Sequence, residues 1–453
     1  MRIRAILKRS VGAHSLVSTD RHIARFEKRT NVTDELRVIE ICAGAGGQAL
    51  GLELAGFEHE LAIELDDSAV STLRHNRPNW KILQGDVADK SVWSPAHYAP
   101  IEGSKPIDLF AGGVPCPPFS IAGKQLGAVD ERDLFAWAVE QTAVLQPRAL
   151  LLENVRGLSM PRFAGYRQHV LDRLREFGYS AEWRLLHASD FGVPQLRPRF
   201  VLVAMRPEDF AYFHWPRPLT ETPTVGRVLS ELMASRGWKG AEAWAAGAAS
   251  IAPTVVGGSK KHGGADLGPT RAKRAWATLG VDGKGIANEA PSPDDSFDVG
   301  PRLTCEMVAR IQGWDDELFS WEFTGKKTSV YRQIGNAFPP PVAHALGTSI
   351  ASALRHQGEQ RDIDAAQDVD PIYRFLRGIG DFVSAARISK ELGIASNGPE
   401  LDRRISILSQ DFEVLKEERV SGLFYKLGTF KGFIGQDEHV RHEYMKTSRS
   451  KVS

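Results

Sequence analysis

The sequence places one cysteine where its thiol could serve as a nucleophile. Cys116 follows the apolar run at residues 107–111 and is flanked by Pro115, Pro117 and Pro118. Proline fixes φ and removes a backbone donor, so such a loop holds its shape. A lone cysteine is more often a small buried hydrophobe, but a proline-bracketed position after a strand favours a presented thiolate. Cys116 is therefore our candidate for covalent catalysis.

Three charged residues lie at the ends of later apolar runs. Glu153 closes the run that begins at residue 149, and Arg197 and Arg199 precede the run at 200–204. A carboxyl group buried at a strand end can have a raised pKa and so donate a proton. Taken singly, Glu153 could instead be a helix N-terminal acid and Arg197 a surface ion-pair partner.

The elements that must position these residues follow an alternating pattern. Short apolar runs predict strands, and amphipathic stretches between them predict helices. This alternation predicts an α/β fold with a Rossmann-like, mostly parallel sheet covered by helices on both faces, which binds ligands beyond the carboxyl ends of its strands. The expected strands are residues 36–41, 60–64, 107–111, 149–153 and 200–204, and the expected helices include 48–55, 68–75 and 166–177.

The first expected strand runs into a glycine-rich turn of the kind that binds nucleotides. Glu64, about 20 positions past the glycines, suits a ribose diol. Asp86, in the sequence Gly85-Asp86-Val87 at the end of a further short strand after residue 64, could accept a hydrogen bond from an adenine amino group. Together they indicate a nucleoside-containing cofactor, and a nicotinamide fits the turn as well as any other. The candidate cofactor-binding residues here are Ala43, Gly44, Gly46, Gly47, Glu64, Leu65, Asp86 and Val87.

Composition limits the class of protein. The chain has 453 residues with 42% apolar and 25% charged residues and a net charge of +1, which is typical of an ordinary globular protein. Three cysteines at wide spacing argue against a disulfide framework or a metal cluster. No apolar run approaches the ~18 residues that cross a bilayer, and the N-terminus leads into no apolar secretory segment. We expect a cytoplasmic protein without a metal.

The chain divides into five segments by pattern. Residues 1–35 form an N-terminal arm, 36–206 the catalytic and cofactor-binding domain, 207–300 a small irregular domain, 301–355 a return to the catalytic domain, and 356–453 a linker with a helical extension. Within the extension, residues 383–394 fit the first half of a helix-turn-helix. A helical packing or dimerisation module is the alternative that we favour there.

Five ordered motifs resemble the DNA (cytosine-5) methyltransferase family. They lie at residues 115–120, 153–155, 195–199, 302–304 with 310–313, and 333–340, and so cover about residues 36 to 352. The resemblance implies a class I methyltransferase fold. It also implies methyl transfer from S-adenosylmethionine, leaving S-adenosylhomocysteine, to carbon 5 of a cytosine flipped out of double-stranded DNA.

The resemblance also implies roles for single residues. Cys116 would add to carbon 6 of cytosine, and Glu153 would hold N3 and the exocyclic amine. Arg199 would lie nearest the base, with Arg197 behind it. Pro115, Asn336 and Ala337 join the residues expected to bind the cofactor.

One position departs from the family pattern. Where the family has Asp-Leu-Phe, this chain has Glu40, Ile41 and Cys42, so the aromatic residue that would contact the adenine is missing. Phe57 or Trp80 could take its place.

The segment at 207–300 occupies the position of the family's target-recognition domain. Basic residues there would neutralise phosphates, and arginine can read guanine in the major groove. For any one of them a solvated charged face is equally expected. The segment from 117 to 133 resembles the family's mobile loop, which closes over DNA. The candidate DNA-binding residues are Ser120, Lys124, Gln125, Lys260, Lys261, Arg271, Lys273 and Arg274.

Several functions remain compatible with the sequence. The first is the modification enzyme of a restriction–modification system, a monomer on DNA with a possible cognate restriction endonuclease. Methylation of RNA cytosine by the same chemistry is an alternative. Others are a non-catalytic DNA-binding regulator on the same fold and a nicotinamide-dependent oxidoreductase, in which the Pro-Cys-Pro-Pro loop would have no task.

Overall fold

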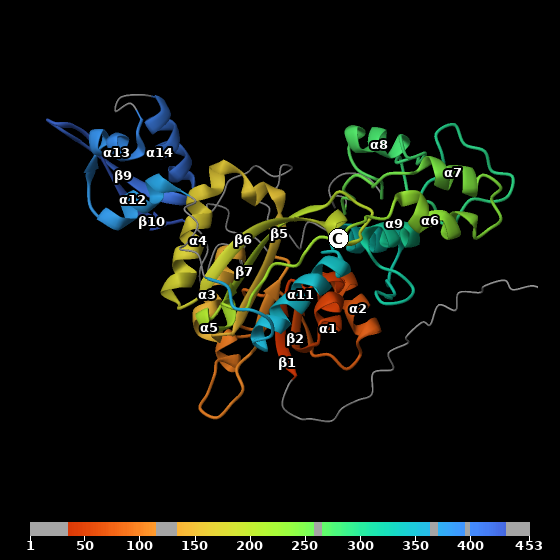
Figure 1. Ribbon diagram of the computed structural model, residues 1–453, viewed down its shortest axis with the longest axis horizontal. Coiled ribbons are helices and arrows are strands. Elements are labelled where there is room, and N and C mark those ends of the chain that lie inside the picture. Colours follow the sequence, from red (N-terminus) through yellow and green to blue (C-terminus); the bar gives the residue numbers. More distant parts are fainter. Residues whose placement is uncertain (1–34, 115–133, 258–264, 363–369, 395–398, 432–453) are drawn as a thin grey trace, which may run out of the picture. The chain divides into compact units, whose positions relative to one another are not determined.

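The computed structural model describes residues 35–114, 134–257, 265–362, 370–394 and 399–431, so the expected N-terminal arm lies almost wholly outside it (Figure 1). Its main feature is a seven-stranded sheet in the order β3-β2-β1-β4-β5-β7-β6. β7 runs antiparallel to both neighbours and the remaining pairs are parallel. The strands are β1 (Leu36–Ile41), β2 (Phe57–Glu64), β3 (Ile82–Gln84), β4 (Leu109–Gly112), β5 (Ala149–Val155), β6 (Ser180–His187) and β7 (Pro198–Met205).

Alternating residues of the strands feed two cores, one on each face of the sheet. Ile39 and Ile41 of β1 belong to the core covered by α3 and α4, and Leu36 and Val38 belong to the core covered by α1 and α11. The predicted mostly parallel α/β fold is therefore confirmed. The covering helices are α1 (Gly47–Leu54), α2 (Asp67–Asn76), α3 (Leu134–Leu145), α4 (Ala164–Glu176) and α11 (Pro340–Leu354).

Residues 207–300 are irregular, and the helices among their described residues are short. Their apolar side chains, such as Val225 and Trp276, share a core with Met307, Ile311 and Ile334 from further along the chain. The region is thus held by elements on both sides of it. The helices within the region are α5 (Pro207–Phe210), α6 (Val225–Ala234), α7 (Ala241–Gly247) and α8 (Thr270–Ala277), and α9 (Cys305–Gln312) and α10 (Lys327–Asn336) follow it.

The C-terminal module, residues 370–431, is only partly the helical extension that we expected. It also contains a three-stranded antiparallel sheet in the order β8-β10-β9, which corrects that expectation. β9 is polar at most positions, whereas β10 carries Leu423, Phe424, Tyr425, Leu427 and Phe430, residue types that are typical of a strand but were not predicted as one. Its elements are α12 (Pro371–Ile379), β8 (Val383–Ser384), α13 (Ala385–Leu392), α14 (Pro399–Asp411), β9 (Phe412–Arg419) and β10 (Gly422–Phe430).

Membrane insertion can be tested only for the described segments. None of the helices in them combines the length and the apolar character that a membrane span requires.

Candidate active site

The turn after β1 is built by three residues with positive φ. Cys42 has φ 51°, Gly44 has φ 57° and Gly46 has φ 98°. A Cβ atom on Gly44 would meet nothing within 4 Å, whereas one on Gly46 would lie 2.4 Å from Cζ2 of Trp321 and one on Gly47 would lie 2.3 Å from the Phe338 carbonyl oxygen. Gly44 thus leaves space beside the turn. Gly46 and Gly47 serve close packing instead.

Glu64, at the end of β2, holds this turn in place. Its Oε2 accepts a hydrogen bond from Gly44 N at 2.8 Å, and its Oε1 accepts from Leu65 N at 2.8 Å and Asp66 N at 2.7 Å. Burial raises the pKa of Glu64, while these three backbone donors oppose the rise. The expected cofactor ligand is therefore also a structural brace of the glycine turn.

The next strand end carries Asp86 and Val87. Oδ1 of Asp86 accepts a hydrogen bond from Ala88 N at 3.0 Å, which fixes the carboxylate just past β3. Val87 is buried, and its carbonyl accepts from Trp93 Nε1 at 2.6 Å. The ends of β1, β2 and β3 thus bring the predicted cofactor-binding residues to one edge of the sheet.

The aromatic ring beside the glycine turn comes from a residue that the sequence did not single out. Trp321 donates a hydrogen bond from Nε1 to the Ala45 carbonyl at 2.8 Å and packs against Gly46. The two substitutes that we expected lie elsewhere, which corrects that expectation. Phe57 begins β2, at the opposite end of the strand, and Trp80 precedes β3 and stacks on His59 at 3.9 Å between ring centroids.

The segment that leads to the candidate nucleophile leaves the sheet beside a carboxylate. β4 ends at Gly112, and a Cβ atom on Gly113 would lie 3.5 Å from Oε2 of Glu153 on the adjacent strand β5. Cys116 and Pro115 lie outside the described residues. The chain therefore enters the proline-bracketed loop within a few residues of the Glu153 carboxyl group.

Glu153 forms a buried ion pair with Arg199 of β7. The distance from Arg199 Nε to Glu153 Oε1 is 2.5 Å, and each side chain is 12% exposed. Burial raises the pKa of Glu153, against the opposing charges of Arg199 and Arg197. Burial also lowers the pKa of Arg199, which Glu153 opposes. The structure thus brings together the carboxylate and the arginine that the sequence predicted to act on one base.

Arg197 differs from Arg199 although both begin the same strand. It is 1% exposed, and its guanidinium donates to three backbone carbonyls: Nη1 to Val255 at 2.7 Å, and Nη2 to Gly335 at 2.8 Å and Ala337 at 2.9 Å. These bonds direct the side chain into the protein. The guanidinium of Arg197 therefore holds backbone segments in place, and its expected position behind Arg199 stays a prediction.

Two glutamines complete the buried network around Arg197. Gln195 donates from Nε2 to Gln312 Oε1 at 2.6 Å and accepts at Oε1 from Val255 N at 2.8 Å. Gln312 in turn donates to the Ala337 carbonyl at 2.8 Å. Both glutamines lie within motifs that the sequence revealed, but their role depends on distant backbone segments and carries no local signal.

Asn336 ends α10 next to these carbonyls and is exposed. A Cβ atom on Gly257 would lie 2.0 Å from Asn336 Oδ1, so a glycine is required there. Ala337 is 8% exposed and follows directly. The last predicted cofactor-binding segment thus lies against the strand-like segment that leads to residues 258–264.

A family model and three relatives match this chain. The model of the C-5 cytosine-specific DNA methylase family matches residues 36–352, which is more than half of the chain. The chain belongs to this family of C-5 cytosine-specific DNA methylases.

The relatives extend the match to different lengths. The Type II methyltransferase M.NaeI of Lentzea aerocolonigenes is 62% identical over 92% of this chain and 99% of its own length. M.NgoMIV of Neisseria gonorrhoeae is 49% identical over 70% of this chain and 98% of its own length. M.Eco47II of Escherichia coli is 33% identical over 70% of this chain and 79% of its own length.

The described DNA-binding candidates of this methylase lie on α8. Arg271 and Arg274 are exposed, whereas Lys273 pairs with Asp266 at 2.7 Å from Nζ to Oδ2. Arg271 and Arg274 thus present their charges to solvent, and Lys273 is engaged within the protein. The remaining candidates lie outside the described residues: Ser120, Lys124, Gln125, Lys260 and Lys261.

Proposed function

We propose that this methylase transfers a methyl group from S-adenosylmethionine to carbon 5 of a cytosine flipped out of a specific duplex DNA sequence. The observation that carries the proposal is the buried Glu153–Arg199 pair beside Gly113. A carboxylate and a guanidinium facing one space can hold the polar edge of a cytosine. The adjoining loop carries the only cysteine among the matched motifs, Cys116.

The proposed reaction proceeds by covalent catalysis. The thiolate of Cys116 forms a bond to carbon 6, which gives the ring an electron-rich carbon 5. Carbon 5 then forms a bond to the methyl group as the bond from methyl carbon to sulfonium sulfur breaks, leaving S-adenosylhomocysteine. Loss of the carbon 5 proton to a base and departure of the thiolate restore the aromatic ring and free Cys116.

Glu153 and Arg199 would stabilise the charge that develops on the ring. Burial raises the pKa of Glu153, which favours sharing of a proton between its carboxyl group and N3 of cytosine. Arg199, which is fixed by the ion pair, would supply positive charge near O2 without rearrangement during the reaction. Arg197 would act indirectly, by holding the backbone on which this arrangement rests.

The residues at the ends of β1, β2 and β3 fit S-adenosylmethionine, which supplies an activated methyl group when bound. The space beside Gly44 leaves room for a ligand next to the backbone. A carboxylate offers about four lone-pair positions, and Glu64 uses three for backbone donors. One position is thus left for a ribose hydroxyl. Asp86 and Asn336 would contact the rest of the molecule.

The names of the relatives support a place in DNA modification. M.NaeI and M.NgoMIV are named Type II methyltransferases. By this similarity we infer a modification enzyme of the Type II kind, acting as a monomer on duplex DNA in the cytoplasm. A cognate restriction endonuclease would cut the same sequence when it is unmethylated.

Tritium transfer tests the proposal. Methyl-labelled S-adenosylmethionine is incubated with duplex DNA and with the native protein, Cys116→Ala, or the matched control Cys305→Ala. We expect label on cytosine carbon 5 with the native protein and with Cys305→Ala, and none with Cys116→Ala. Full labelling by Cys116→Ala would refute the covalent mechanism. Labelling of tRNA but not DNA would instead establish the RNA substrate.

A further inference from the structure

The C-terminal module has the element order of a winged helix-turn-helix. Its chain runs helix, strand, helix, helix, strand, strand, and the three strands form one antiparallel sheet. α13 and α14 are the helix pair, and α13 ends at Gly393 with a positive φ of 65°. β9 and β10 form the hairpin that follows the second helix. In modules of this build the second helix of the helix-turn-helix pair, here α14, commonly lies in the major groove of DNA.

The module is fixed to the catalytic domain through an apolar and aromatic contact with α4. His169 stacks on Phe430 at 4.3 Å between ring centroids, and Tyr166 lies 5.8 Å from the same ring. A Cβ atom on Gly165 would lie 3.0 Å from Leu408 of α14. These contacts involve the first turns of α4, which leave little freedom for the module to turn on the helix.

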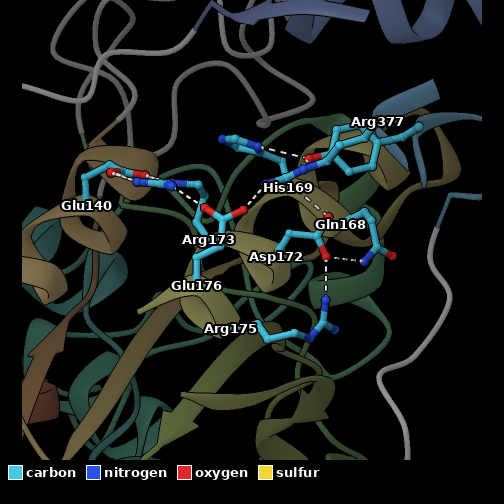
Figure 2. A network of polar contacts seen from close by, with 9 residues as sticks. Glu140, Gln168, His169, Asp172, Arg173, Arg175, Glu176 and Arg377 are labelled. Carbon is cyan, nitrogen blue, oxygen red and sulfur yellow. Dashed lines mark hydrogen bonds and ion pairs between the residues drawn. The ribbon is translucent and has the colours of Figure 1, made fainter. Parts of the chain in front are cut away.

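Polar contacts reinforce the same junction, as Figure 2 shows. Arg377 of α12 pairs with Asp172 at 3.1 Å and also with Glu176, both on α4. His169 Nδ1 lies 3.2 Å from the Tyr373 hydroxyl. The module therefore contacts α4 through both aromatic and polar interactions.

The junction lies near the catalytic edge of the sheet. β5 ends just past Glu153, and two short 3-10 turns, η3 (Arg156–Ser159) and η4 (Pro161–Phe163), lead directly into α4. α14 contacts both η4 and α4. The twelve positions from Glu153 to Gly165 span at most about 40 Å. The module is thus anchored within reach of any duplex whose cytosine enters the active site.

The outer face of α14 suits a DNA groove. Leu401, Ile405 and Leu408 are buried against the module, so the opposite face of the helix is solvent-exposed. That face presents Arg403, whose side chain is 73% exposed, together with the exposed residues Ser406 and Gln410. Arginine, serine and glutamine are the side chains that hydrogen-bond base edges and phosphates.

α13 adds positive charge beside this face. Arg387 and Lys390 are both exposed, and in a helix-turn-helix the first helix crosses the DNA backbone. Arg403 lies at the centre of the outer face of α14, where Glu400 is 3.6 Å from its guanidinium, and the exposed acids Asp402 and Glu391 lie at the margins. A duplex on this face would therefore meet Arg403, Arg387 and Lys390, and its phosphates would compete with Glu400 for Arg403.

A relative without room for the module strengthens the argument. M.NgoMIV matches over 98% of its own length but only 70% of this chain, which is about the share that the family model spans. M.NaeI matches over 92% of this chain. The family's fold is thus complete without the last hundred residues, and the module is an addition to the catalytic fold.

We propose that the outer face of α14, with α13 beside it, binds the same DNA duplex as the active site, in the flank outside the methylated sequence. The occupant is duplex DNA, recognised through phosphates and groove edges by Arg403, Gln410, Arg387 and Lys390. The proposal rests on the proposed function, because the flank belongs to the duplex that carries the target cytosine. Binding of the flank by α14 and α13 would raise the affinity of the protein for long DNA without changing the methyl transfer.

The test compares duplexes of different arm length. The methylated cytosine is first mapped by sequencing DNA that the native protein has modified. α14 is about 20 Å long, so the 40 Å reach extends to about 60 Å, or about 18 base pairs at 3.4 Å each. Duplexes with arms of about 8 and about 25 base pairs on either side of the site therefore exclude and include the module.

We expect the full-length protein to bind the long-armed duplex about tenfold more tightly than the short one, with the extra arm needed on one side only. Arg403→Ala with Gln410→Ala should abolish most of that gain, since one good arginine contact to DNA contributes about tenfold. Its affinity and methylation rate on the short duplex should match those of the native protein. Arg184→Ala, at an exposed arginine of β6 on the sheet face opposite α4, is the charge-matched control and should keep the gain.

Three results would overturn the proposal. The first is equal affinity of the native protein for both duplexes, as expected if the module binds a separate DNA or another protein. The second is an equal loss by the double variant on short and long duplexes. The third is an equal loss by the Arg184→Ala control. Absence of methylation on every duplex would refute the proposed function instead, so the two failures are distinguishable. Hydroxyl-radical footprinting should show flank protection that the double variant loses.

Discussion

The catalytic edge of the sheet and the C-terminal module use charge in opposite ways. At the edge, Glu153, Arg197 and Arg199 are buried and paired with each other or with backbone carbonyls. In the module the core is apolar, and cations such as Arg403 and Arg387 are exposed. Buried charge is costly to desolvate and must be held by fixed partners, so it suits chemistry at a defined atom. Exposed charge adapts to a long, repetitive ligand.

The same difference sets what each region tolerates. Removal of a buried partner leaves the other charge without compensation, which costs several kcal/mol. Removal of an exposed arginine costs little stability. Substitutions at the edge should therefore affect reaction rate or folding, whereas substitutions on the outer face of the module should affect only binding.

The largest effect is expected at the buried pair. Glu153→Gln removes the charge of the carboxyl group at nearly constant size, and Arg199→Lys keeps a positive charge but loses the planar guanidinium contact of the proposed transition state. Loss of one such contact lowers kcat by about 10²- to 10³-fold. Single-turnover methylation at saturating DNA and S-adenosylmethionine measures this. Arg206→Lys, at the other end of β7, is the control and should keep a normal rate. A raised KM with unchanged kcat would mean that the pair only binds substrate.

The next effect concerns stability rather than rate. Arg197→Met removes the donor for the carbonyls of Val255, Gly335 and Ala337. Because buried carbonyls without donors cost about 1–3 kcal/mol each, we expect unfolding to be easier by roughly 3 kcal/mol. Urea denaturation followed by tryptophan fluorescence measures it. Arg206→Met, which loses one part-buried bond, should cost less than about 1 kcal/mol. Unchanged stability with lost activity would return Arg197 to the catalytic group.

The smallest effect is a dependence of module docking on pH. Burial, helped by the charges of Arg377 and Arg173, lowers the pKa of His169 to about 3. The ordinary value is about 6.5, so the undocked or unfolded state binds more protons between these two values. Docking stability is therefore complete above pH 6.5 and falls as the pH drops below it, by at most about 2 kcal/mol at pH 5.

Hydrogen exchange measures this change. At pH 5, after correction for intrinsic rates, protection of Phe412 to Phe430 should be weaker than at pH 7 in the native protein. His169→Gln cannot titrate, so its protection should not change between the two values. Equal pH dependence in the two proteins would mean that a group other than His169 causes the effect. Asp370 at the junction would act in the opposite direction, because burial raises its pKa and docking would then become more stable as the pH falls.

The sequence predicted the central sheet well because the apolar runs of buried parallel strands are strong signals. β1 has the predicted bounds, β5 ends two residues later than predicted, and β7 begins two residues earlier and ends one residue later. β6 was not predicted, because this edge strand includes polar residues at Glu182, Arg184 and His187 that mask its alternation.

The parts that escaped prediction depend on contacts between distant segments. Arg197 and Arg199 share one motif, but Arg197 is buried only because Val255 and Gly335 approach it from 58 and 138 residues away. Trp321 reaches the glycine turn across 276 residues. The fit of residues 383–394 to a helix-turn-helix indicated part of the module, but its packing on α4 arises from scattered aromatic residues such as Phe430.

The packing at Gly46 and Gly47 has a consequence for the order of synthesis. The turn after β1 emerges from the ribosome early, yet the surfaces that close on it, at Trp321 and Phe338, are made almost 300 residues later. Residues 207–300 are translated in between. A nascent chain therefore cannot assemble the complete turn before the intervening region has been synthesised, so a truncated product that lacks that region also lacks a finished site and cannot modify DNA indiscriminately.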